Sequence, residues 1–256
     1  MATSTSRSIV LHPDQIDLEI SASLQRKLIA EAAAFDLELT SDQARLCIGH
    51  LLYVQQVNSY INLTRIVDID DAVILHILDS LLMCQGLQLQ DTRFLDMGTG
   101  AGFPGIPFHI FSECEGVLLD SVGKKVDAVN AFISQLGLKG LHCVHDRLES
   151  YAVQNHDTFD VVLARAVGHL SLLIEYGSPF LKDKGLLVLA KANPTSDELD
   201  AGARAASLCG LKEVDRFVFD LPHDMGHRLI IHYQKISKPT ISLPRAVGVA
   251  RKNPLA

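Results

Sequence analysis

The stretch Phe94-Leu-Asp-Met-Gly-Thr-Gly-Ala-Gly-Phe-Pro-Gly-Ile-Pro107 decides the fold of this chain. The apolar pair Phe94-Leu95 leads to Asp96 and then to four glycines within eight positions: Gly98, Gly100, Gly102 and Gly105. Such glycine density lets a backbone turn sharply and approach a ligand without interference from Cβ atoms. A strand that feeds a turn of this kind, with helix-compatible residues after it, predicts the nucleotide-type pocket of an α/β sheet.

From Arg93 onward the pattern alternates between strands and helices, which is typical of a largely parallel sheet. We predict strands at Phe94–Met97, Val117–Asp120, Leu141–Val144, Asp160–Ala164, Leu186–Ala190, Glu213–Leu221 and Leu229–Gln234. The last two are joined by a loop alone and must lie antiparallel. This combination predicts a Rossmann-like class I methyltransferase fold, with a seven-stranded, mostly parallel sheet and an antiparallel last strand.

The residues before the first strand have helical periodicity. Leu24 and Leu28 belong to one apolar stripe, Thr40-Ser41 can cap a second helix, and Asp70 to Met83 forms a third helical stretch. We therefore divide the chain into an N-terminal helical extension, residues 1–90, and a cofactor-binding domain with a basic tail, residues 91–256.

Composition limits the cellular setting. The chain has 256 residues, 48% of them hydrophobic, and no apolar run approaches the roughly 18 residues that a membrane helix needs. Ala2 to Ser8 lacks an apolar signal core, and five scattered cysteines indicate buried thiols, so we expect a cytoplasmic protein, and a monomer. His142 and His145 would face opposite sides of a strand, so we expect no metal site.

Charge is distributed unevenly along the chain. The net charge is −7, but Lys235 to Ala256 carries five basic residues and no acid, which leaves −12 for the remainder. A basic tail on an acidic body is typical of a focused contact with phosphates, although a solvated tail that aids solubility has the same composition.

The glycine loop also matches the dinucleotide pattern, with Asp120 at a suitable distance beyond it. Two details oppose a pyrophosphate: the carboxylate of Asp96 at the mouth of the turn, and the bulk of Phe103-Pro104 where phosphate would meet a helix N-terminus. S-adenosylmethionine has no phosphate and carries an ammonium group that Asp96 can attract, directly or through backbone groups and water. We therefore predict S-adenosylmethionine as the cofactor.

Acidic residues after the next two strands fit the nucleoside part of this cofactor. Asp120 ends the second predicted strand, where an acid accepts hydrogen bonds from ribose hydroxyls. After the third strand, Asp146-Arg147-Leu148-Glu149 offers acceptors for the adenine amino group, and the sequence alone favours Asp146. A helix cap is the alternative for Asp146.

The loop after the fourth strand, Leu163-Ala164-Arg165-Ala166-Val167, is expected to face the methyl group. It contains no Asn/Asp-Pro-Pro-Tyr motif for amino acceptors, and no cysteine nucleophile lies near strands four or five. An acceptor with a free lone pair, such as guanine N7, needs no general base. Arg165 is a candidate for the methionine carboxylate or RNA, or for a structural ion pair.

Taken together, these residues resemble the GidB/RsmG family, bacterial methyltransferases acting on guanine N7 of small-subunit ribosomal RNA. The resemblance rests on the glycine loop and on further matches along the chain: Asn62-Leu63-Thr64, His76-Ile-Leu-Asp79-Ser80, Leu119-Asp120-Ser121, Arg147-Leu-Glu149, Ala164-Arg165-Ala166, Lys191 and Arg228-Leu-Ile-Ile. It implies methylation of 16S ribosomal RNA or of the small subunit. A small-molecule methyltransferase and a non-catalytic, cofactor-sensing module that binds the ribosome are the alternatives.

The resemblance also implies which residues contact the cofactor and the substrate. It implies cofactor contacts at Gly98, Phe103, Leu148, Glu149 and Arg165, which moves the adenine contact from Asp146 to Glu149. With the residues argued above, the predicted cofactor set is Asp96, Gly98, Gly100, Phe103, Asp120, Leu148, Glu149 and Arg165. The predicted substrate contacts are His76, Lys191, Arg228, Arg245 and Lys252. Removing Lys238 to Ala256 is predicted to abolish RNA methylation and to leave cofactor affinity nearly intact.

Overall fold

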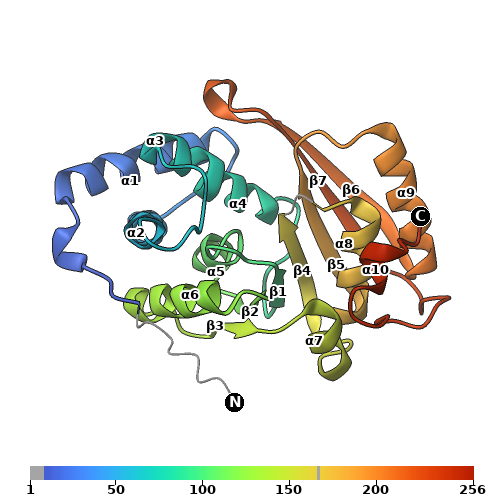
Figure 1. The fold of residues 1–256 in the computed structure, drawn as a ribbon. Helices are drawn as coiled ribbons and strands as arrows, with labels where there is room; N and C mark the ends of the chain where they lie inside the picture. Colours follow the sequence, from blue (N-terminus) through green and yellow to red (C-terminus); the bar gives the residue numbers. More distant parts are fainter. Residues whose placement is uncertain (1–8, 166–167) are drawn as a thin grey trace, which may run out of the picture.

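A seven-stranded sheet forms the centre of the computed structural model, which describes residues 9–165 and 168–256 (Figure 1). The strand order is β3-β2-β1-β4-β5-β7-β6. The strands are β1 (Arg93–Met97), β2 (Glu115–Asp120), β3 (Leu141–His145), β4 (Phe159–Arg165), β5 (Leu181–Lys191), β6 (Leu211–Asp220) and β7 (His227–Lys235). Strand β7 lies antiparallel between β5 and β6, while β1 to β5 are parallel. The predicted class I arrangement is confirmed.

The start of β5 differs most from the prediction, which placed this strand at Leu186–Ala190. Helix α8 spans Leu170–Gly177, and a 3₁₀ turn, Ser178–Phe180, follows it. Pro179 sits in this turn, and proline cannot donate the backbone hydrogen bond that would continue a helix. Strand β5 therefore begins at Leu181, five residues before the predicted start.

Side-chain alternation along the strands gives the sheet two apolar faces. Phe94, Leu118 and Leu163 belong to one core, shared with the N-terminal helices and with α5 (Gly105–Ser112) and α6 (Gly123–Leu136). Leu95 and Leu119 belong to the other core, under α7 (Leu148–Gln154), α8 and α9 (Ser196–Leu208). Figure 1 shows the sheet between these two helical layers.

The N-terminal layer contains α1 (Leu18–Ala33) and α2 (Ser41–Asn58). Helix α2 begins as predicted, because Thr40 and Gln43 form a capping box. The apolar core continues from these helices onto the sheet without a break at residue 90. The domain division at that residue stays a prediction.

The third predicted helix is present from Ile69 to Cys84, but it is not a regular α-helix. It runs through α3 (Ile69–Ala72), a π-helical segment (Val73–Leu78), α4 (Asp79–Leu81) and a 3₁₀ turn (Leu82–Cys84). Widened π turns inside helices are frequent at functional sites. This segment carries His76 and presents Asp79 at its end.

The C-terminal part of the chain contacts both the N-terminal layer and helix α8. The β6–β7 hairpin reaches the N-terminal layer, where Phe219 packs on Phe35 with ring centroids 5.9 Å apart. After β7 the chain runs to a short helix, α10 (Val249–Lys252), which lies against α8 (Figure 1). Within the described ranges, none of the helices combines the length and the apolar character needed to cross a membrane.

Candidate functional site

The glycine loop turns at the carboxyl end of β1 through residues with positive φ. Gly98 has a φ of 75°, and its N–H donates to the carbonyl oxygen of Leu119 at 2.8 Å. Apart from its two chain neighbours, a Cβ atom at Gly98 would meet no atom of the described residues within 4 Å, so this glycine leaves open space for a ligand. At Gly105 a Cβ would lie 2.1 Å from Cδ2 of Leu118, so the helix start can approach β2 only without a side chain.

Asp96 supports this loop from below. Its side chain is fully buried, and Oδ2 accepts a hydrogen bond from the N–H of Gly105 at 2.9 Å. Burial raises the pKa of Asp96 to about 6, against the lowering effects of the neighbouring Thr99 hydroxyl, of the Gly105 N–H and of Arg165. Within the described residues, Oδ1 and the nearby hydroxyl of Thr99 are buried and lack a hydrogen-bond partner of good geometry. Asp96 thus fixes the loop and keeps one acceptor unused.

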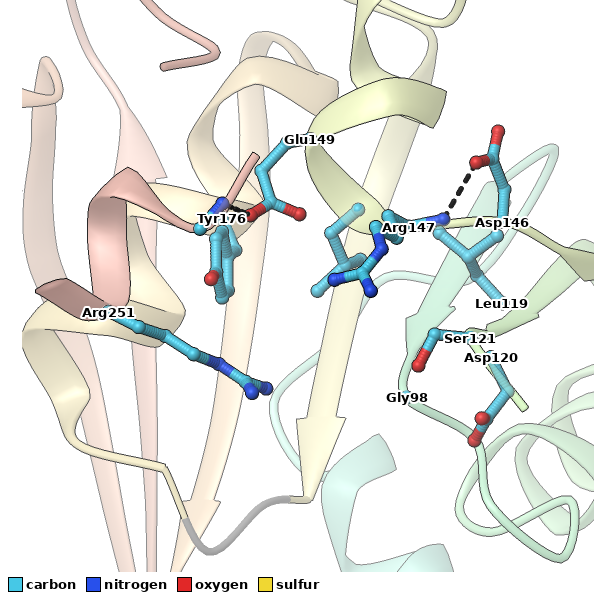
Figure 2. A pocket seen from close by; sticks show the side chains of 11 residues that line it. Gly98, Leu119, Asp120, Ser121, Asp146, Arg147, Glu149, Tyr176 and Arg251 are labelled. Carbon is cyan, nitrogen blue, oxygen red and sulfur yellow. Dashed lines mark hydrogen bonds between the residues drawn. The ribbon is translucent and has the colours of Figure 1, made fainter. Parts of the chain in front are cut away.

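A cavity opens between the glycine loop and the ends of β2 and β3 (Figure 2). We call it the glycine-loop cavity, and it is lined by Gly98, Leu119, Asp120, Ser121, Asp146, Arg147, Leu148, Glu149, Tyr176, Gly248 and Arg251. Four predicted cofactor residues meet here: Gly98, Asp120, Leu148 and Glu149. Asp146, which the acidic loop also suggested, lies beside them.

Asp120 is oriented by the backbone around it. Oδ2 accepts from the N–H of Gly100 at 3.0 Å, and Oδ1 accepts from the N–H of Val122 at 2.9 Å. Each carboxylate oxygen has a second lone pair, so both remain able to accept from ligand hydroxyls. Gly100 therefore acts on the cavity through Asp120 and is not itself among the lining residues.

Phe103 and Arg165 lie outside the glycine-loop cavity, in a neighbouring cluster. The ring of Phe103 stacks on His76, with centroids 4.5 Å apart and planes within 6°. The guanidinium carbon of Arg165 is 5.6 Å from the same ring centroid. The cofactor contacts assigned to these two residues stay predictions, and Ala166-Val167 of the predicted acceptor loop lie outside the described residues.

The carboxylate of Asp79 joins two arginines from different strands. Oδ2 pairs with Nη1 of Arg165 at 3.1 Å, and Oδ1 pairs with Nε of Arg228 at 2.8 Å. Asp79 is 4% exposed, and the Arg165 side chain also donates to the carbonyl oxygens of Leu75 and His76. We call Asp79, Arg165 and Arg228 the Asp79 cluster. The structural ion pair that the sequence left open for Arg165 is present.

Two neutral histidines flank Phe103. Burial, with Arg165 nearby, lowers the pKa of His76 to about 3, and burial lowers the pKa of His50 to about 4. Since guanidinium only donates, Nδ1 of His76 accepts from Arg165 at 3.4 Å, and Nε2 donates to the Thr64 hydroxyl at 2.8 Å. His50 donates from Nε2 to the carbonyl oxygen of Ala101 at 2.9 Å, which ties α2 to the glycine loop.

The remaining predicted substrate contacts are less free than the sequence suggests. Lys191 pairs with Glu198 at 2.8 Å and donates to the carbonyl oxygen of Gly168 at 2.8 Å. Arg245 forms a bidentate pair with the buried carboxylate of Glu175. Lys252 is exposed.

The structure corrects the amount of free positive charge that the sequence predicts for the basic tail. Two of its five cations are paired inside the protein: Arg245 with Glu175, and Lys235, which is 5% exposed, with Asp157. Lys238, Arg251 and Lys252 remain on the surface. The local charge count overstated the free positive charge, because it could not include acids that the fold brings from elsewhere.

Tyr176, Gly248 and Arg251 are cavity residues that sequence reasoning missed. Tyr176 comes from α8, while Gly248 and Arg251 come from the C-terminal segment, far along the chain from the glycine loop. No local motif marks them, since only the folded topology brings them to the cavity. The sequence predicts Arg251 as part of the basic, RNA-contacting tail and not as part of the cofactor cavity.

The fold and the cavity define a class I methyltransferase. Archaeal solved structures are similar in fold: a transferase from Pyrococcus horikoshii (TM-score 0.53, 11% identity, 63% of each chain) and TYW2 from M. jannaschii in complex with AdoMet (TM-score 0.51, 17% identity, 64% of this chain and 76% of that one). The profile of the GidB family, described as rRNA small subunit methyltransferase G, matches residues 44–222. The chain belongs to this family.

Individual relatives agree with the family match. Proteins named ribosomal RNA small subunit methyltransferase G are 34% identical in Acetivibrio thermocellus, over 93% of this chain and 99% of the relative, and 36% identical in Acholeplasma laidlawii, over 86% and 95%. A third, from Desulfitobacterium hafniense, is 35% identical over 86% of this chain and 92% of the relative. The alignments span nearly the full length of each relative.

Proposed function

We propose that this protein transfers a methyl group from S-adenosylmethionine to N7 of a guanine in 16S ribosomal RNA. The observation that carries the proposal is that the family match includes the glycine loop and the walls of the glycine-loop cavity up to Tyr176. Relatives named for methylation of small-subunit ribosomal RNA support the substrate class. We further propose that it acts in the cytoplasm as a monomer.

The cavity suits S-adenosylmethionine in the character of its lining groups. The paired acceptors of Asp120 fit ribose hydroxyls, Glu149 and the apolar side chain of Leu148 fit adenine, and Gly98 leaves room for close backbone approach. The unused oxygen of Asp96 lies beneath the loop, and a ligand ammonium nearby would favour its ionised form. The bound cofactor would supply an electrophilic methyl group.

Guanine N7 carries a lone pair and no hydrogen, so the protein needs no general base for this acceptor. Its contribution is to hold the base in line with the methyl group and to exclude water. In this proposal the Asp79 cluster and the neutral His76 form the substrate side, at the carboxyl end of β4. Exposed cations of the tail, Lys238, Arg251 and Lys252, contact RNA phosphates.

The decisive experiment combines the protein with methyl-labelled cofactor and with 16S RNA from a strain that lacks the modification. Naked RNA and assembled small subunits are tested in parallel, and the label is mapped by primer extension after cleavage at 7-methylguanine. Label at one guanine N7 supports the proposal. Label on another atom refutes the acceptor, whereas cofactor binding without transfer supports a non-catalytic module.

A small-molecule methyltransferase makes a different prediction in the same assay. Such an enzyme would transfer label to an acceptor in a protein-free, RNA-depleted cell extract and leave ribosomal RNA unlabelled. The free cations of the tail favour RNA over this alternative, because a small acceptor has no use for a separate basic surface.

A further inference from the structure

The C-terminal segment is anchored on α8 by a buried acid. Nε and Nη2 of Arg245 contact the two carboxylate oxygens of Glu175 at 2.7 and 2.5 Å, and the Glu175 side chain is 3% exposed. Nη2 also donates to the carbonyl oxygen of Asn253 at 2.9 Å, so one guanidinium holds both ends of the segment. We call residues 245–253 the C-terminal strap. Bidentate pairs of this kind fix geometry as well as adding energy.

The strap forms one wall of the glycine-loop cavity. The N–H of Gly248 donates to Oε1 of Glu149 at 2.9 Å, and Arg251 follows on α10 and lines the cavity. Figure 2 shows Arg251 reaching toward the space that Arg147 enters from the other side. Glu149 therefore lines the cavity and also accepts a hydrogen bond from the strap.

Helix α8 connects the anchor to the cavity. Glu175 holds Arg245, while the next residue, Tyr176, lines the cavity between Glu149 and Arg251 (Figure 2). The hydroxyl of Tyr176 is protonated at neutral pH, and burial and the neighbouring Glu149 raise its pKa further. A shift of the strap would thus remove Gly248 from Glu149 and Arg251 from the cavity together.

We propose that Glu175 and Arg245 are positioning residues for the cofactor, because their ion pair docks the strap that completes the cavity opposite Asp120. This inference rests on the proposed function of the same cavity. Docking of the strap and binding of the cofactor are then coupled, and coupling of two equilibria is reciprocal. RNA that binds the exposed cations of the strap changes cofactor affinity through the same contacts.

The proposal reverses the expectation from sequence that removal of the tail leaves cofactor affinity nearly intact. The test is calorimetric binding of S-adenosylhomocysteine to full-length protein without RNA. Arg245→Met should weaken binding about ten-fold or more, and Arg245→Lys should recover part of the loss, since lysine keeps the charge without the bidentate fork. Arg251→Met, which alters an exposed side chain, should also weaken binding.

A matched control comes from β6, where Arg216 forms a bidentate pair with Glu213 at 2.8 and 3.0 Å, away from the cavity. Arg216→Met should bind like the unmodified protein. In methylation assays Arg245→Met should raise the KM for the cofactor and leave kcat at saturating cofactor nearly unchanged, which general loss of structure would not produce.

The two possible failures are distinguishable. If the unmodified protein binds S-adenosylhomocysteine and both Arg245→Met and Arg251→Met bind equally well, the strap has no role in the cavity and the inference is overturned, while the proposed function stands. If the unmodified protein does not bind, the assignment of the cavity itself is wrong. Weaker binding in Arg245→Met with recovery in Arg245→Lys supports the inference.

Discussion

Replacing Asp79 by alanine removes the carboxylate that two arginines share in the Asp79 cluster, and we expect a loss of about 3–5 kcal/mol in unfolding free energy. Asp79 is 4% exposed, and the side chains of Arg165 and Arg228 are each 16% exposed. The variant would leave both guanidinium groups largely out of water without the carboxylate that they share. Removing one partner of a buried pair is expensive because the remaining charge keeps its desolvation cost.

The magnitude can be worked from the lost contacts. Two charge-assisted hydrogen bonds disappear, at 3.1 Å to Arg165 and at 2.8 Å to Arg228. Each is worth about 1.5–3 kcal/mol. Arg165 keeps its hydrogen bonds to the carbonyl oxygens of Leu75 and His76, and Arg228 keeps its bond to that of His227. The loss in unfolding free energy should therefore lie in the lower part of the range of about 3–5 kcal/mol.

The assay is equilibrium unfolding in urea at pH 7, with the free energy obtained by linear extrapolation. Asp42→Ala is the matched control, because Asp42 pairs with Arg45 on the surface, where the side chains are 86% and 58% exposed, and such pairs contribute little. A loss no larger for Asp79→Ala than for Asp42→Ala would refute the reasoning. The apolar triple variant Asp79→Leu/Arg165→Met/Arg228→Met should recover much of the loss, since it leaves no unpaired charge.

Three further predictions concern the loop and its surroundings. Asp120→Asn should weaken S-adenosylhomocysteine binding by about 1–3 kcal/mol in calorimetry, because one amide oxygen replaces two acceptors; unchanged affinity would exclude Asp120 as a ligand. Gly105→Ala should cost about 1–3 kcal/mol of unfolding free energy in urea, since its Cβ would lie 2.1 Å from the Leu118 side chain, and an unaltered midpoint would contradict this packing. The folded-state pKa values of His50 and His76, lowered to about 4 and about 3, mean that below pH 6.5 the unfolded chain takes up more protons. The free energy of unfolding should therefore fall between pH 6.5 and 5. Asp96, whose pKa is raised to about 6, has a smaller effect in the opposite direction. A higher urea midpoint at pH 5 than at pH 6.5 would contradict this prediction.

The strands could be predicted because their signal is local. Apolar runs of four to eight residues with turn residues between them mark the strands, and two strands without a crossover can only be antiparallel. Boundaries were less accurate where a tertiary contact extends an element. Strand β5 begins at Leu181 because that residue pairs with Phe159 across a register shift in the sheet, which no local pattern reveals.

The π-helical segment was not predictable for a related reason. Val73-Ile-Leu-His-Ile-Leu78 has residue types that an α-helix accepts equally well. Its wider turn accompanies long-range contacts: Arg165, 90 residues later, donates to the carbonyl oxygen of Leu75. A spacing of three residues places His76 and Asp79 close to one face of a helix, but it does not identify the two arginines that meet Asp79 there.

The same limit separates the predicted site from the observed one. Gly98, Asp120 and Glu149 follow strands whose carboxyl ends meet at one edge of the sheet, so their proximity follows from the topology. The strap residues obey no such rule, since Gly248 reaches Glu149 across 99 positions of sequence. The basic composition of the tail and the family resemblance predicted an RNA contact for Arg245. The structure pairs Arg245 with Glu175 instead, and the residue pattern of helix α8 does not indicate this pair.

The N-terminal layer and the C-terminal strap therefore support opposite sides of the region around the glycine-loop cavity. From the N-terminal layer, His50 donates to Ala101 and His76 stacks on Phe103, so the outer side of the glycine loop is held by helices that precede the sheet. From the C-terminal strap, Gly248 fixes Glu149 on the facing wall. A ligand enclosed between these walls contacts elements that come together only in the complete fold. Because a ligand that binds the native state alone stabilises that state, cofactor binding would stabilise both outer layers as well as the sheet.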